Sequence, residues 1–164
     1  MATRAIIRIA DRKEGVSFNE HPLISKYHIY HHYDGYPEYL GVTLANYLSD
    51  ISVVNGNISF EYLGGKSKVA NGLGCLAVQL ICHLKLANSG CNQDGTLDIS
   101  AGNVYLDPWD LGRDDVDYIY YVWAAEGKDV WISIFERGTD DNYSLCSFVG
   151  TPDKLLKKYK GKLN

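Results

Sequence analysis

The 164-residue chain has little of what marks an exported or membrane-bound protein. No stretch approaches the roughly 18 consecutive apolar residues that a membrane-spanning helix needs. The first residues, Met1 to Ile6, run directly into an alternating apolar pattern instead of the apolar block of a signal peptide. We therefore expect a cytoplasmic protein that has no membrane partner.

Cysteine and positive charge are also scarce. The four cysteines, Cys75, Cys82, Cys91 and Cys146, form no C-x-x-C pair, and two of them lie in an apolar helical pattern, so we expect free thiols in the core. Sixteen basic residues against twenty acidic ones give a net charge of −4. A protein that binds duplex DNA needs a basic surface to displace counterions, so duplex DNA is not an expected partner.

What is present is the composition of one ordinary globular domain. Hydrophobic residues make up 46% of the chain and charged residues 22%, which excludes a generally disordered protein. A chain of this length can bury about 70% of its unfolded surface as a single unit. We expect one domain spanning residues 1–164.

The periodicity of the apolar residues predicts an α+β fold. Strand patterns cover residues 3–10, 27–32, 103–106, 116–124, 129–137 and 143–149, with a further short one at 58–63. Short polar links between the last four long patterns predict an antiparallel meander. Helical patterns cover residues 38–50, with Pro37 at the first position, 73–87, and a short C-terminal segment that begins at Pro152. The second helix is apolar on most of its circumference, which predicts a central helix that packs across the sheet.

The segment from Tyr30 to Pro37 gathers the most chemistry, at a predicted junction between strand and helix. His32 can act as a general acid or base with Asp34 as its orienting partner, because a nearby carboxylate fixes the imidazole tautomer. The alternative is structural: Asp34 caps the turn or the helix, and Gly35 supplies a backbone angle that other residues disfavour. His28 and His32 are too far apart along a strand to share a metal ion, so we expect no metal site here.

A second candidate site opens the second helix. The run Asn71-Gly72-Leu73-Gly74 places small residues at a predicted helix N-terminus, where backbone N–H groups can bind phosphate. Its spacing matches neither common nucleotide-binding glycine motif. Close packing of a glycine against the sheet is the alternative explanation.

Two acidic segments have more ordinary interpretations. Within residues 90–101, residues 92–98 match the middle of a calcium-binding EF-hand loop, but the acidic residues needed at both ends are missing, so we expect a polar turn. A series of aspartates, which includes Asp107, surrounds Trp109, and we expect a solvated turn there.

Two motifs resemble those of a loose group of small bacterial and phage proteins without established activity. The first is Tyr-x-His-x-Asp-Gly-Tyr-Pro at residues 30–37, which follows a similar start at residues 2–4. The second is Gly-x-Gly-Cys-Leu-Ala-x-Gln-Leu at residues 72–80. The resemblance implies a phage or prophage origin. Interference with host defence is common among such small phage proteins, and that expectation comes from the resemblance alone.

The leading functional hypothesis is a non-catalytic binding protein, possessing no cofactor, that captures a nucleotide-like ligand or a host protein. Aromatic side chains would stack on a base while the helix N-terminus or His32 meets a phosphate. The candidate ligand-binding residues are Tyr30, His32, Asp34, Tyr36, Asn71, Gly72, Gly74 and Trp109. One alternative is a small hydrolase or nuclease that uses His32 and Asp34. Another is a structural or homo-oligomeric accessory protein whose thirteen tyrosines serve a subunit interface.

Overall fold

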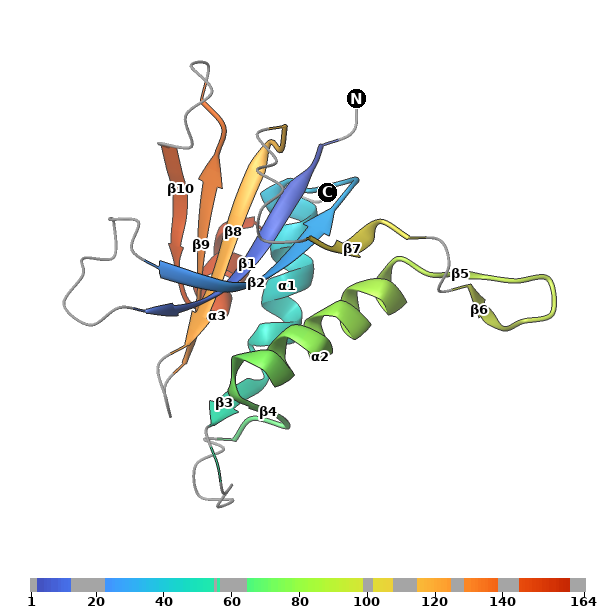
Figure 1. Cartoon of the computed structure of the whole chain (residues 1–164), viewed down its shortest axis with the longest axis horizontal. Coiled ribbons are helices and arrows are strands. Elements are labelled where there is room, and N and C mark those ends of the chain that lie inside the picture. The colour runs from blue at the N-terminus through green and yellow to red at the C-terminus, as the bar shows by residue number, and fades with distance from the viewer. Residues whose placement is uncertain are drawn as a thin grey trace.

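A computed structural model describes residues 3–12, 23–54, 56, 65–98, 102–107, 115–124, 129–138 and 145–159. Within these ranges the chain forms an α+β domain built on one mixed, mainly antiparallel sheet (Figure 1). The predicted fold class is therefore confirmed. No helix in the described ranges is long and apolar enough to cross a bilayer.

The described part of the main sheet has six strands in the order β10-β9-β8-β1-β2-β7. Their bounds are β1 (Ala5–Arg12), β2 (Leu23–His31), β7 (Val104–Leu106), β8 (Tyr118–Ala124), β9 (Val130–Glu136) and β10 (Leu145–Gly150). β1 runs parallel to β8, and all other neighbours are antiparallel. The N-terminal strand therefore occupies the middle of the sheet.

The predicted meander is confirmed only for its last three strands, β8, β9 and β10. The preceding strand, β7, pairs with β2 at the far edge of the sheet, and β1 and β2 lie between β7 and β8. Sequence spacing suggests which strands are neighbours along the chain, but it does not show that an earlier hairpin will insert between them. The predicted strand at residues 58–63 lies outside the described residues.

The helices and the minor strands are connected to the main sheet as follows. A π-helical turn, η1 (Pro37–Gly41), leads into α1 (Val42–Leu48), and α3 (Pro152–Tyr159) follows β10. Two parallel strands, β3 (Ile51–Val54) and β4 (Lys68–Asn71), lead into α2 (Gly72–Ala87), which is followed by a hairpin of β5 (Gly90–Cys91) and β6 (Leu97–Asp98). The polar turn expected within residues 90–101 connects β5 and β6, where Asn92 N–H donates to the carbonyl of Thr96 at 2.8 Å.

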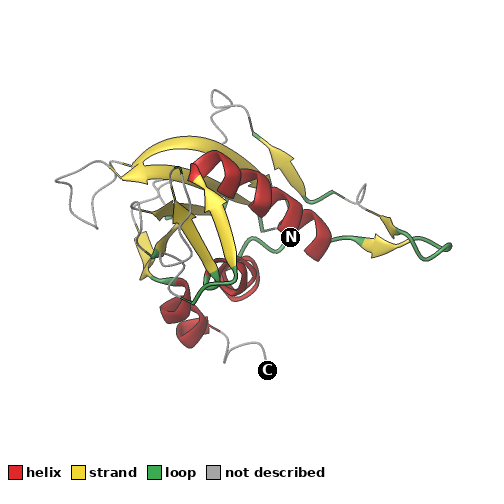
Figure 2. Cartoon of the chain, turned by 90° about the horizontal axis from the view of Figure 1, so that it is seen from below, coloured by secondary structure: helices red, strands yellow, loops and turns green. Residues whose placement is uncertain are grey.

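One face of the sheet, called the helix face below, is covered by α1, α2 and α3. Figure 2 shows α2 running across the strands. Side chains at Ala5, Ile7, Ile9 and Ile29 point toward the helices and join a core that includes Leu44, Leu80 and Leu155. This core is mostly aliphatic, as expected for strands and helices that bury one surface of each.

Helix α2 is not the fully buried helix that its sequence predicts. Leu76, Ala77, Leu80 and Leu84 are buried, but Val78 is 61% exposed and Leu86 is 53% exposed. The helix lies across β1, β2 and β7 on a single side, so nothing in the described chain covers its outer stripe. The expectation of core thiols is wrong for the same reason at Cys82, which is exposed, and also wrong at Cys146, which is exposed on β10.

The other face of the sheet, called the aromatic face below, contains no helical residue in its buried cluster. Side chains from β1, β2, β8 and β9 alternate onto it, as period-two geometry requires. Its aromatic members are Tyr30, Tyr121, Trp123, Trp131 and Phe135. Trp123 and Trp131 stack with ring centroids 5.3 Å apart. The two faces therefore differ in chemistry as well as in the elements that cover them.

Candidate functional site

The first predicted site begins at the end of β2, where Tyr30 and His32 contact each other. The Tyr30 hydroxyl lies 2.9 Å from Nδ1 of His32, and the ring of Tyr33 packs edge-on against His32 with centroids 4.2 Å apart. Tyr30 also contacts Tyr105 of β7, at 6.1 Å between centroids. His32 is thus oriented by a phenol, and among the described residues no hydrogen bond joins it to Asp34.

Asp34 is exposed and adopts a left-handed backbone conformation with φ of 54°. Aspartate is one of the few residues that accept this region readily. The structural alternative for this segment therefore needs correction, because the special backbone angle belongs to Asp34 and Gly35 does not have a positive φ. Asp34 also does not cap the helix, since the N-cap of η1 is Tyr36 and no side chain bonds there.

Gly35 is required by close approach to β1. A Cβ atom at this position would lie 2.8 Å from Cβ of Ala5 and 2.9 Å from the carbonyl carbon of Arg4. The Gly35 N–H donates to the carbonyl of Thr3 at 2.9 Å, and its carbonyl accepts a 2.7 Å bond from the hydroxyl of buried Tyr120. The Asp-Gly turn therefore attaches the end of β2 to the start of β1 and sets the entry into η1.

Pro37 begins the helical segment as the sequence predicts, and Tyr36 is the N-cap residue before it. Pro37 is buried at the start of η1, and the ring of Tyr36 lies 6.1 Å from that of Tyr39. Trp109, the remaining aromatic candidate, lies outside the described residues. Tyr36 therefore contacts a helical tyrosine, and no described contact joins its ring to Tyr30 or His32.

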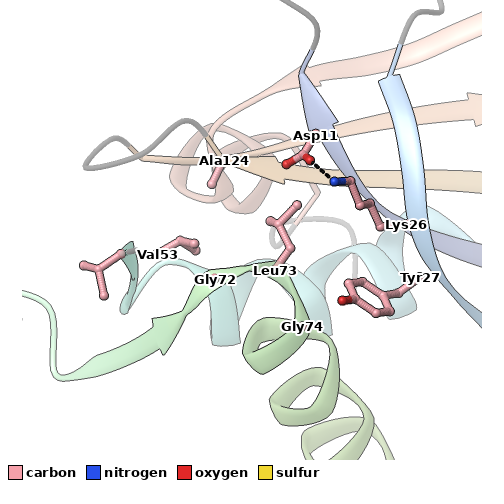
Figure 3. Close-up of a pocket in the computed structure, with 9 residues that line it drawn as sticks. Asp11, Lys26, Tyr27, Val53, Gly72, Leu73, Gly74 and Ala124 are labelled. Carbon is pink, nitrogen blue, oxygen red and sulfur yellow. Dashed lines mark ion pairs between the residues drawn. The ribbon is translucent and has the colours of Figure 1, made fainter. Parts of the chain in front are cut away.

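The second predicted site lines a cleft at the N-terminus of α2. Gly72, Leu73 and Gly74 form one side of an open cleft of about 380 Å³, and Val53 and Val54 of β3 form another (Figure 3). The remaining lining residues are Asp11, Lys26, Tyr27 and Ala124. This volume lies within the roughly 300–1,000 Å³ range of small-molecule sites.

The glycines at the start of α2 leave this helix end open. Gly72 has φ of +77°, a conformation that side chains disfavour. A Cβ atom on Gly74 would lie 3.0 Å from the hydroxyl of Tyr27, so a larger residue would narrow the cleft. Asn71 makes no capping bond to the first turn, because its side-chain oxygen accepts from Gly56 N–H at 3.1 Å. No side chain in the described residues therefore caps the first-turn amides of α2, which carry the partial positive charge of the helix.

The charged side of the cleft comes from β1 and β2. Lys26 Nζ lies 2.6 Å from a carboxylate oxygen of Asp11, and this partner raises the pKa of Lys26 (Figure 3). Both side chains are nearly half exposed, so this ion pair contributes little to folding. Sequence reasoning missed Asp11, Lys26 and Tyr27, because their position depends on a register shift between β1 and β2 that no local motif marks.

The structure does not bring the two predicted halves together. Tyr30 belongs to the buried cluster of the aromatic face, whereas Tyr27 faces α2 across the cleft. They are three positions apart on β2, so their side chains point to opposite faces of the sheet. The candidate residues therefore form two separate groups, one around His32 and one at the start of α2.

The acidic series is less uniform than the sequence suggests. Asp107 is only 8% exposed, which corrects the expectation of a solvated turn at this residue, because it extends β7 beside β2 instead of entering the loop. Asp115 pairs with Arg4 at the surface, and Asp117 accepts the Arg4 N–H at 2.7 Å. Among the described residues, no three His, Cys, Asp or Glu side chains are close enough to hold a metal ion.

Comparison with family models, curated proteins and solved structures finds no match to this chain. Function must therefore be argued from the geometry of its own residues.

Proposed function

We propose that the protein binds a nucleotide-like anion in the cleft at the N-terminus of α2. The observation that carries the proposal is the convergence there of an uncapped sixteen-residue helix, a lysine, a tyrosine and an apolar wall. The first-turn amides and Lys26 would meet a phosphate. Tyr27, Val53 and Leu73 would contact the base or sugar.

Because of the Asp11 carboxylate, the two charged side chains of the cleft should affect anion binding in opposite directions. Asp11 and Lys26 form an ion pair at the cleft, and the carboxylate repels an entering anion while it holds the ammonium group. A bound phosphate must share Lys26 with Asp11 or displace it. Removing the charge of Asp11 should therefore strengthen binding, and removing that of Lys26 should weaken it.

The other functional predictions stay predictions. The hydrolase hypothesis built on His32 and Asp34 gains no support from their contacts, because His32 bonds to Tyr30 and Asp34 is exposed. The phage origin, the role in counter-defence and the cytoplasmic location still rest on the resemblance and the composition. A host-protein partner is the principal competing form of the binding hypothesis.

The test is isothermal titration of ATP, ADP, AMP and a cyclic dinucleotide into wild type and four variants. We expect Lys26→Gln to weaken binding about tenfold, the usual effect of losing one charge-assisted hydrogen bond. Asp11→Asn should tighten it. Lys85→Gln, which alters a lysine beside Tyr105 away from the cleft, and His32→Ala should leave it unchanged.

Two results would contradict the proposal. One is the absence of a binding heat, or of a thermal shift, with every nucleotide at millimolar concentration. The other is equal weakening of binding by Lys26→Gln and Lys85→Gln, because binding would then depend only on the overall charge of the protein.

A further inference from the structure

A β-bulge on β2 places Ser25 and His28 on the same face of the sheet. Residues three apart on a regular strand point to opposite faces. Here Tyr27 pairs with Ile9 and Ser25 pairs with Ala10, so Lys26 has no opposing residue on β1. Ala10 belongs to the aromatic-face cluster, and Ser25 opposite it therefore shares that face with His28. Bulges often redirect a side chain beside an active site.

The serine and the histidine are in hydrogen-bonding contact. Ser25 Oγ lies 2.5 Å from Nε2 of His28. Ser25 is 9% exposed and His28 is partly exposed, so the hydroxyl is shielded while the imidazole reaches the surface. A hydroxyl within this distance of an imidazole nitrogen is the arrangement that activates a serine nucleophile.

A buried carboxylate lies next to the same histidine. The Asp107 N–H donates to the carbonyl of His28 at 3.0 Å, which places Asp107, the residue after β7, beside His28. The Asp107 charge raises the pKa of His28, although burial and the charge of Arg8 have the larger effects and lower it overall. A carboxylate here favours the imidazolium that forms when His28 accepts a proton.

An arginine completes the row across the sheet. Arg8 of β1 is the register partner of His28 on β2 and of Tyr121 on β8. Its guanidinium donates to the hydroxyl of Tyr121 at 2.8 Å, and its buried Nε has no hydrogen-bond partner. The Arg8 charge lies close enough to His28 to lower its pKa, and a guanidinium beside a serine–histidine pair can stabilise a developing oxyanion.

We propose that Ser25 is a catalytic nucleophile for carboxylic esters, with His28 as its general base, Arg8 as the oxyanion donor and Asp107 as a positioning residue. The site lies on the aromatic face and is independent of the cleft at α2. It also differs from the His32 and Asp34 pair that the sequence suggested.

The proposed reaction passes through an acyl-enzyme. Ser25 Oγ bonds to the carbonyl carbon while its proton moves to Nε2 of His28 and the carbonyl electron pair moves to oxygen beside Arg8. The carbonyl then re-forms, the ester C–O bond breaks, and the leaving alcohol takes the proton from Nε2. Water next attacks the acyl carbon, gives a proton to Nε2, and releases the carboxylic acid as Ser25 regains its proton.

The test uses a fluorophosphonate probe on the full chain, with adducts located by peptide mass spectrometry. The Ser25 oxygen would bond to phosphorus and expel fluoride. We expect one adduct, on Ser25, and its loss in Ser25→Ala. His28→Gln should slow labelling at least about 100-fold, which is the lower end of the rate enhancement that a general base provides. Ser147→Ala, which removes a hydroxyl that donates to Ile134 on β9, is the matched control and should label at the wild-type rate.

The pH profile of labelling in wild type does not depend on whether any variant folds. Among the described residues, the charged or titratable groups on the same face around His28 are Arg8 on β1, Tyr121 beyond it on β8, Tyr30 on β2 and Asp107 just after β7. Labelling should rise with pH and reach half its maximum below the ordinary histidine value of about 6.5. Asp107→Asn should move that midpoint lower still, a shift that a purely structural role would not produce.

Either of two results would overturn the assignment. The first is a wild-type protein that gains no adduct on Ser25, with p-nitrophenyl acetate hydrolysed no faster than by Ser25→Ala. The second is a His28→Gln variant, folded by circular dichroism, that labels at the wild-type rate.

Discussion

The two faces of the central sheet are built from alternate residues of the same strands, yet they have different chemistry. The helix face is packed mainly with isoleucine, leucine, valine and alanine, with few aromatic residues among them, and three helices contribute to it. The aromatic face carries tyrosine, tryptophan and phenylalanine, and the polar row of Arg8, His28 and Asp107 crosses it. On β1, for example, Ile7 and Ile9 supply packing on the helix face while Arg8 supplies a charge on the aromatic face.

This difference separates the sources of stability from the sources of chemistry. Aliphatic side chains packed under helices have few ways to relax, so the helix face should dominate the free energy of unfolding. Polar and aromatic groups tolerate partial exposure because their polar ends can meet water or a ligand. The aromatic face should therefore accept substitution more easily than the helix face.

The largest expected effect comes from neighbouring isoleucines on β1. Ile7 is fully buried on the helix face, and Ile6 is 2% exposed on the aromatic face. We expect Ile7→Ala to lower the free energy of unfolding by about 4 kcal/mol and Ile6→Ala by about 2 kcal/mol, within the usual range for cavity-forming substitutions. Urea unfolding of both variants gives the comparison directly, since the two changes remove the same atoms from the same strand. Equal losses would show that the aromatic face is packed as tightly as the helix face.

A smaller loss of stability is expected from adding a methyl group at one of two glycines close to the sheet. Gly35 lies where the turn meets β1, and an added Cβ would clash with backbone and side-chain atoms there. Gly35→Ala should therefore cost about 1–3 kcal/mol. Gly41 in η1 is the matched control, because its added Cβ would lie at ordinary contact distance, 3.6 Å, from Leu155. Gly41→Ala should be neutral or stabilising by about 0.5–1 kcal/mol, since alanine restricts the unfolded chain. Thermal unfolding that shows both variants equally destabilised would contradict the close-approach explanation for Gly35.

Much of the fold could be predicted from local pattern, because strands and helices leave their periods in the sequence. The strands that became β1, β2, β8, β9 and β10 were all expected, as was the proline that begins α3. The order of those strands in the sheet could not be predicted, since the β1–β8 pairing joins residues more than a hundred positions apart. The exposure of Val78 and Leu86 was missed for a related reason, because an apolar residue does not reveal whether anything covers it.

The candidate sites also include residues that the local sequence reveals and residues that only the strand pairing reveals. The glycines at the start of α2 were recognisable because small residues before a helical pattern indicate an open helix end. The Ser25 and His28 contact was not recognisable, since a spacing of three on a strand normally separates the side chains and only the bulge reverses this. Asp107 was noticed only as part of an acidic series, because its burial depends on the pairing of β7 with β2.

The smallest expected effect compares two histidines that are buried to different degrees, His31 of β2 and His83 of α2. His31 is 1% exposed, its Nδ1 has no hydrogen-bond partner, and burial lowers its pKa. The unfolded chain takes up a proton near pH 6.5 while the folded chain resists, so stability is complete above pH 6.5 and falls as the pH drops below it. His31→Leu should therefore flatten the dependence of the urea midpoint on pH between about 6.5 and 5. His83→Gln, in which a half-buried histidine stacked on Tyr47 is replaced, should flatten it less. If His31→Leu keeps the full acid sensitivity, the proton uptake belongs to the aromatic face, and His28 becomes the group to replace next.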